Sequence, residues 1–186
     1  MLGAILAAQL ATTSATPPPP RAVETTSQLS IAGGFRCDVR GCLVPVFSLG
    51  LRVDVLYHPG PRAYGVGAFL STRSDNFADI APTLGASLLL PVTEAFPIVV
   101  SAGGALRIDS VGVAGGPLER VWFGARSYNF QTPYVFSGGA FVEGRQFVAG
   151  ANSGWDVIFG FDGDLEILAI PWIALYTWIA RTDRRH

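Results

Sequence analysis

Residues 47–57 alternate with a period of two, and this pattern constrains the fold of the chain more than any other feature. Large apolar side chains occupy every odd position from Phe47 to Tyr57, and the even positions carry mostly small or charged side chains. Alternation over eleven residues predicts a β-strand with one apolar face, and such a strand is long for a soluble sheet. The same period recurs in residues 98–109 and 156–167, and more weakly in five other segments. We therefore expect an all-β chain.

Turn-rich breaks separate eight predicted strands and keep neighbouring strands close in sequence. Short connections join antiparallel neighbours, so the expected topology is an antiparallel up-and-down barrel of about eight strands. Residues 169–180 form either a last strand or a short apolar helix at the barrel rim, and Asp162-Gly163 could form a further hairpin turn. The breaks are residues 38–41, 58–61, 74–76, 91–95, 110–117, 131–133 and 151–154.

The placement of the apolar faces decides between a membrane barrel and a soluble one. No internal apolar stretch reaches the ~20 residues that a membrane helix needs, whereas a membrane strand needs only ~9–11. The chain has 15% charged residues and a mean hydropathy of +0.38, and soluble domains carry more charge on their surface. Glycine and serine are frequent on the polar faces, which suits the narrow interior of an eight-stranded barrel. We expect a transmembrane β-barrel with its apolar faces toward lipid, and a soluble ligand-binding barrel as the alternative.

The amino terminus has the features of an export signal followed by a linker. Residues 1–15 combine a short apolar core with small residues suited to signal-peptidase cleavage, although the segment carries no basic side chain. Residues 16–28 include four consecutive prolines and then a polar stretch without period, which predicts a Pro-rich linker. The barrel domain would then be residues 29–180, and residues 181–186 a polar tail. These features predict an exported protein of the outer membrane of a Gram-negative bacterium.

Cys37 and Cys42 are the two cysteines of the chain, and they flank the first predicted turn. A short hairpin brings such residues within bridging distance, and an exported protein meets an oxidising compartment. Two thiols without a histidine are poor zinc ligands. We therefore expect a disulfide between Cys37 and Cys42 that fixes a loop.

Charged side chains on the polar faces of the predicted strands are expected to line the barrel interior. The last strand is acidic and the first two strands carry arginine, so closure of the barrel would bring opposite charges together at the seam. We expect an ion-pair network that fills the lumen, with a conducting pore or a ligand site as the alternative. The residues are Arg36, Arg52, Asp54, Arg107, Asp109, Arg126, Glu143, Arg145, Asp156, Asp162, Asp164 and Glu166.

With these strands, this export signal and these interior charges, residues 29–168 resemble the small outer-membrane barrels, such as the OmpA-type transmembrane domain and OmpX. The resemblance is one of pattern without a family-specific motif, and it implies the compartment and the architecture but no activity. The chain departs from these barrels at its carboxyl end. They usually end in an aromatic residue, whereas the nearest aromatic residues here, Tyr176 and Trp178, are followed by a polar tail.

Few residues are suited to catalysis or to holding a cofactor. All 13 basic residues are arginine, which excludes Schiff-base and phosphate-loop lysines. His58 lies in a Pro-Gly turn and His186 at the end, neither near a recognisable Ser/Asp arrangement. The net charge of −1 differs from that of a polybasic nucleic-acid binder. We therefore expect no enzyme, no cofactor, no metal and no nucleic-acid partner.

The expected function is a structural or surface-interaction role in the outer membrane. The expected partners are outer-membrane lipid and, during insertion, the barrel-assembly machinery. The predicted loops at 74–76, 110–117 and 151–154 would touch a partner that the sequence does not identify. Two other function classes stay open, a narrow outer-membrane channel and a soluble periplasmic carrier of an apolar ligand.

Overall fold

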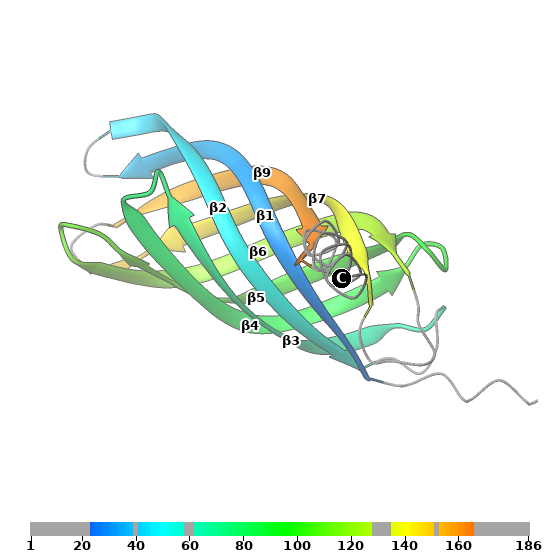
Figure 1. Ribbon diagram of the computed structural model, residues 1–186. Coiled ribbons are helices and arrows are strands. Elements are labelled where there is room, and N and C mark those ends of the chain that lie inside the picture. Colours follow the sequence, from blue (N-terminus) through cyan, green and yellow to red (C-terminus); the bar gives the residue numbers. More distant parts are fainter. Residues whose placement is uncertain (1–22, 39–40, 58–61, 128–134, 151–152, 166–186) are drawn as a thin grey trace, which may run out of the picture.

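The chain forms a closed β-barrel of eight long strands (Figure 1). The computed structural model describes residues 23–38, 41–57, 62–127, 135–150 and 153–165. Each long strand pairs antiparallel with the next one along the chain, and the first pairs with the last, which confirms the predicted all-β, up-and-down topology. Within the described ranges the strands are β1 (Val23–Asp38), β2 (Gly41–Tyr57), β3 (Gly65–Asp75), β4 (Asp79–Pro91), β5 (Pro97–Ile108), β6 (Val113–Arg126), β7 (Ser137–Phe147), the two-residue β8 (Ala149–Gly150) and β9 (Gly154–Asp164).

The pairing of β1 with β9 closes the barrel and extends from Gln28 opposite Asp164 to Asp38 opposite Gly154. The register also sets the tilt of the strands. A path of paired residues that starts at Phe123 and passes once around the barrel returns to β6 at Val113, ten residues away. Such a stagger requires strands tilted against the barrel axis, and eight strands leave an interior that side chains can fill.

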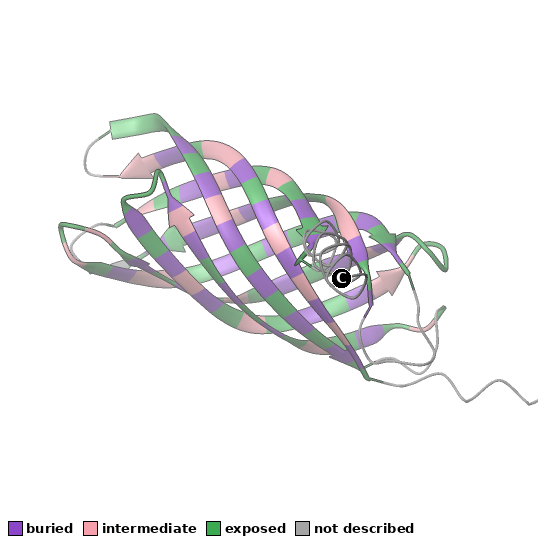
Figure 2. Ribbon diagram, viewed as in Figure 1, coloured by how far each residue is buried: buried purple, intermediate pink, exposed green. Residues whose placement is uncertain are grey.

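Buried and exposed residues alternate along every long strand, and the polar faces point inward (Figure 2). On β2, Leu51 is 47% exposed whereas Arg52 is 4% exposed. On β9, Phe159 is 47% exposed and Ile158 is fully buried. The interior therefore holds most of the charged side chains, and the outer wall is mainly apolar, which is the opposite of the usual arrangement in a soluble barrel.

Glycine allows the strands to approach closely where the interior is crowded. Gly85 on β4 and Gly103 on β5 pair directly across the sheet, both on the inward side. A Cβ atom added to Gly103 would lie 2.7 Å from the Cα atom of Gly85, which is closer than real Cβ contacts allow. This pair therefore requires glycine for steric reasons.

Two predicted boundaries were wrong by several residues. β1 begins at Val23, so the wall includes residues 23–28, which we had assigned to the linker. The reason is that Glu24, Thr26 and Gln28 already point inward, so their polarity belongs to the interior face of a strand. β6 begins at Val113, inside the break predicted at 110–117. The predicted signal at 1–15, the helix or strand at 169–180 and the tail at 181–186 lie outside the described residues.

Candidate functional site

The barrel interior is the candidate site, because it gathers charged side chains from all eight long strands. Seven arginines and eight carboxylates of the described residues are buried there. They include ten of the twelve residues expected to line the lumen. These ten are Arg36, Arg52, Asp54, Arg107, Arg126, Glu143, Arg145, Asp156, Asp162 and Asp164.

Arg145 on β7 lies at the centre of the largest ion-pair network. Its Nη2 atom lies 2.8 Å from Oδ2 of Asp75 on β3 and 3.0 Å from Oδ2 of Asp156 on β9. Its Nε atom is 3.9 Å from Oε1 of Glu143 on its own strand. One guanidinium therefore connects three carboxylates from three strands. The charge of each carboxylate is balanced inside the barrel, where water cannot screen it.

The network continues from Arg145 in both directions along the interior. Arg36 contacts Asp75, Asp79 and Asp156, the last through an Nε–Oδ1 distance of 3.0 Å across the β1–β9 seam. In the other direction, Arg73 donates to Glu143 at 2.9 Å, and Arg120 contacts both Glu143 and Asp162. The connected set contains equal numbers of arginines and carboxylates. Its members are Arg36, Arg73, Arg107, Arg120, Arg145, Asp75, Asp79, Glu143, Asp156 and Asp162.

Arg52 forms a separate cluster with hydroxyl groups from two other strands. Its Nε and Nη2 atoms each lie 2.6 Å from an oxygen of Asp54, which is a bidentate contact. Nη2 also donates to the hydroxyl groups of Ser87 on β4 and Ser101 on β5, at 3.1 and 2.8 Å. We expected the arginines of the first two strands to meet acidic residues of the last strand, but Arg52 forms an ion pair with Asp54, two residues along β2.

Three inward phenylalanines cover the planar faces of the arginines. The guanidinium carbons of Arg73 and Arg120 lie 4.7 and 3.8 Å from the ring centre of Phe141. Arg52 lies in the same way over Phe69 at 4.1 Å, and Arg107 over Phe147 at 4.4 Å. Such contacts stabilise a cation further when water is excluded. The interior is thus packed by guanidinium, carboxylate and aromatic groups together.

Five buried charges were missed by the sequence analysis, namely Glu24, Arg73, Asp75, Asp79 and Arg120. Alternation could have found Arg73 and Asp75, because they lie on the same face of β3 as Phe69 and Ser71. Asp75 falls within the break that we predicted at 74–76. Arg120 likewise shares the parity of Trp122 and Arg126. The sequence analysis missed Glu24 because the polar residues around it resemble a linker.

Two residues of the predicted set are not among the buried charges of the described strands. Asp109 lies half-buried in the turn between β5 and β6, and its carboxylate interacts electrostatically with the buried Arg107. Its Oδ1 atom accepts hydrogen bonds from the backbone N–H groups of Val111 and Gly112, at 2.8 and 3.1 Å. An aspartate that caps a turn in this way can still continue the alternation of the strand before it. Glu166 lies outside the described residues.

The arrangement is suited to packing more than to chemistry. Beside Arg52, Arg120 and Trp122 the cavity holds only about 10 Å³ for the centre of a water molecule, which is about the minimum for one water. A larger cavity, of about 100 Å³, lies beside Arg36 and Asp79. Among the described residues, no group of three or more His, Cys, Asp or Glu side chains is placed to hold a metal ion. The disulfide between Cys37 and Cys42 is confirmed, and it joins the ends of β1 and β2.

The outer wall is the second candidate surface. Leucine, valine, isoleucine and phenylalanine side chains are exposed around the whole barrel, with examples at Ile31, Leu70, Leu84 and Phe161, which are all more than half exposed. No helix within the described part of the chain is long and apolar enough to cross a membrane.

No family model and no curated protein matches the chain. The chain is similar to a solved structure described as "De novo design of transmembrane beta-barrels", with a TM-score of 0.39 and 11% sequence identity. The similarity covers 75% of this chain and 95% of the designed one.

Proposed function

We propose that the chain is a small outer-membrane β-barrel with a structural or surface-interaction role and without catalytic activity. Its wall would contact lipid, and its ends would present the turns to partners on either side of the membrane. Insertion would require the barrel-assembly machinery of a Gram-negative bacterium.

One observation carries this proposal, the inversion of the ordinary distribution of polarity. Apolar side chains such as Leu51 and Phe159 are exposed on the outer wall, while seven arginines are buried inside. Contiguous exposed apolar surface on this scale is not tolerated by monomeric proteins in water. In lipid the same surface is stable, and the closed sheet leaves no unpaired backbone edge in the hydrocarbon.

The packed interior favours a closed barrel over the two alternatives. A carrier of an apolar ligand needs an apolar cavity, whereas Arg145, Arg120 and Arg36 lie across this interior with their carboxylate partners. A channel needs a continuous water-filled passage, and the same side chains occupy its place. A non-conducting barrel therefore agrees best with the geometry.

Substitution of Leu51 tests the membrane proposal. Leu51→Arg places a cation on the outer wall, which costs about 2–4 kcal/mol near the middle of a bilayer. Tyr64→Arg is the control, because Tyr64 is 71% exposed just before β3, where an added charge can reach water. The purified parent is expected to float with phospholipid vesicles and to migrate differently on a gel before and after heating. Leu51→Arg should unfold at lower urea concentration in vesicles than Tyr64→Arg. A parent that stays soluble and monomeric without lipid or detergent would contradict the proposal.

A further inference from the structure

Glu119 is an exception on the apolar outer wall. It is the one charged residue in the described strands whose side chain is exposed, whereas the other charged strand residues are buried or, at the end of β1, half-buried. It is the seventh of the fourteen residues of β6, far from both ends of the wall. Its paired neighbours are Ala102 on β5 and Gly144 on β7, which offer no hydrogen-bonding side chain. A carboxyl group at this depth in lipid would lack hydrogen-bond partners.

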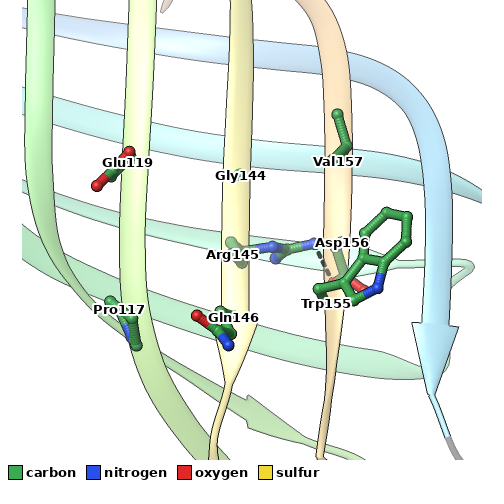
Figure 3. Close-up of a pocket in the computed structure, with 8 residues that line it drawn as sticks. All are labelled: Pro117, Glu119, Gly144, Arg145, Gln146, Trp155, Asp156 and Val157. Carbon is green, nitrogen blue, oxygen red and sulfur yellow. Dashed lines mark ion pairs between the residues drawn. The ribbon is translucent and has the colours of Figure 1, made fainter.

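The wall is recessed beside Glu119. A groove of about 350 Å³ lies over Gly144, with Pro117 and Glu119 of β6 on one side and Val157 and Trp155 of β9 on the other (Figure 3). A Cβ atom added to Gly144 would meet nothing within 4 Å. A second molecule could therefore approach the backbone closely at this point, as small residues permit between membrane segments.

Gln146 is a second polar residue of the outer wall, and it lies in the axial direction from Glu119. It lies on β7, two residues beyond the partner of Glu119, and its side chain is exposed in the same groove. A step of one strand (~4.8 Å) and two residues (~6.6 Å) makes an angle of ~36° with the strands. Strands in barrels are themselves tilted by about 35–45° from the axis. Because of the stagger of the barrel, a line parallel to the axis that passes from β6 to β7 also advances along β7 toward the end of the barrel at which β1 finishes. Gln146 lies in that direction from Glu119, so the two residues lie on a line parallel to the barrel axis.

Residues on a line parallel to the barrel axis can meet their own copies when two barrels associate in a membrane. All copies of a protein insert in the same orientation, so two copies that associate are related by a two-fold axis parallel to the membrane normal. A residue beside that axis meets the same residue of the other copy at the same depth. Glu119 and Gln146 can both pair with themselves, since an amide donates and accepts, and two carboxyl groups can share one proton in an O–H···O hydrogen bond.

We propose that the β6–β7 wall is the interface of a two-fold symmetric dimer in the membrane, centred on Glu119 and Gln146. The proposal rests on the membrane insertion proposed above. The occupant of the groove is thus a second copy of this chain, whose own Glu119 and Gln146 supply the hydrogen bonds that lipid lacks.

Cysteine cross-linking in vesicles tests the interface. Val100 on β5 continues the same axial line on the other side of Glu119, and it is 37% exposed. Val100→Cys should therefore form an intermolecular disulfide under mild oxidation. Leu51→Cys is the matched control, because β2 lies on the opposite side of the eight-stranded barrel. Cys37 and Cys42 are already paired with each other and do not interfere.

Substitution of Glu119 in the Val100→Cys background tests the hydrogen bonds. Glu119→Leu should reduce the dimerisation constant about tenfold, the value expected for one or two hydrogen bonds in a membrane. Glu119→Gln should keep most of the dimer, because the amide still donates and accepts. Heat-modifiable gel mobility shows that each variant is folded.

The outcomes separate the two proposals. Barrels that float with vesicles but cross-link equally at Val100→Cys and Leu51→Cys, or not at all, overturn the dimer and leave membrane insertion intact. Folded Glu119→Leu protein that dimerises as well as the parent also overturns the role of Glu119. Protein that does not enter vesicles overturns both proposals together.

Discussion

At the scale of single residues, the interior depends on charged side chains that are almost completely buried. Arg145 illustrates this, because it is 2% exposed and connects Asp75, Asp156 and Glu143. An ion pair in such a place adds little net stability, since both partners lose their hydration. Loss of one partner lowers the stability strongly, because the remaining charges are then buried without compensation.

Arg145→Leu should therefore be strongly destabilising. It leaves three carboxylates without their shared cation, and a cost of about 3–5 kcal/mol is expected from breaking a buried pair. Arg62→Leu is the control, since the ion pair of Arg62 with Glu94 is exposed and worth at most ~1 kcal/mol. Urea unfolding in detergent micelles measures both. Equal midpoints for the two variants would show that the interior charges are hydrated.

At the scale of elements, β1 and β9 approach each other closely along the seam. Gly34 of β1 is paired with Ile158 of β9 and faces inward. A Cβ atom on Gly34 would lie 2.8 Å from the Cα atom of Ile158, whereas one on the adjacent Gly33 would meet only a carbonyl oxygen at 3.8 Å. There is thus no room for a side chain at Gly34, whereas there is room for one at the adjacent Gly33.

Gly34→Ala should weaken the seam while Gly33→Ala should not. Overpacking typically costs about 1–3 kcal/mol, and a substitution without a clash stays within ~0.5 kcal/mol. Urea unfolding in micelles compares the two variants under identical conditions. If Gly34→Ala is as stable as Gly33→Ala, the two strands are farther apart than described.

The elements also show how far the sequence could predict this molecule. Period-two alternation was enough to assign Leu51 outward and Arg52 inward, because a strand has only two faces. It did not show that Asp109 lies in a turn, because the alternation continues past Ile108, where β5 ends. It could not predict that Arg36 meets Asp79 and Asp156 together, because that contact depends on the stagger of the closed barrel.

At the scale of the whole molecule, charged and aromatic side chains fill the barrel interior. The buried arginines and carboxylates of the described residues nearly balance each other, seven against eight. Phe69, Phe141 and Phe147 fill space between them. An ion that crossed the barrel would have to displace paired charges rather than follow water.

Planar-bilayer recordings of the intact barrel should therefore show no steady channel openings. A general porin in the same bilayers is the positive control for insertion and recording. Regular single-channel steps from this protein would mean that the ion pairs between arginines and carboxylates separate readily. Such steps would support the channel alternative.

The pairing of β1 with β9 also determines when the protein can fold. Gln28 of β1 pairs with Asp164 of β9, so the edge of β1 that faces β9 stays unpaired until almost the whole chain is synthesised, although the other edge pairs with β2. Until then both edges of the growing sheet are open, and open edges pair with other chains. The barrel can therefore close only after almost the whole chain is available, and until then its open edges must be kept from pairing with other chains.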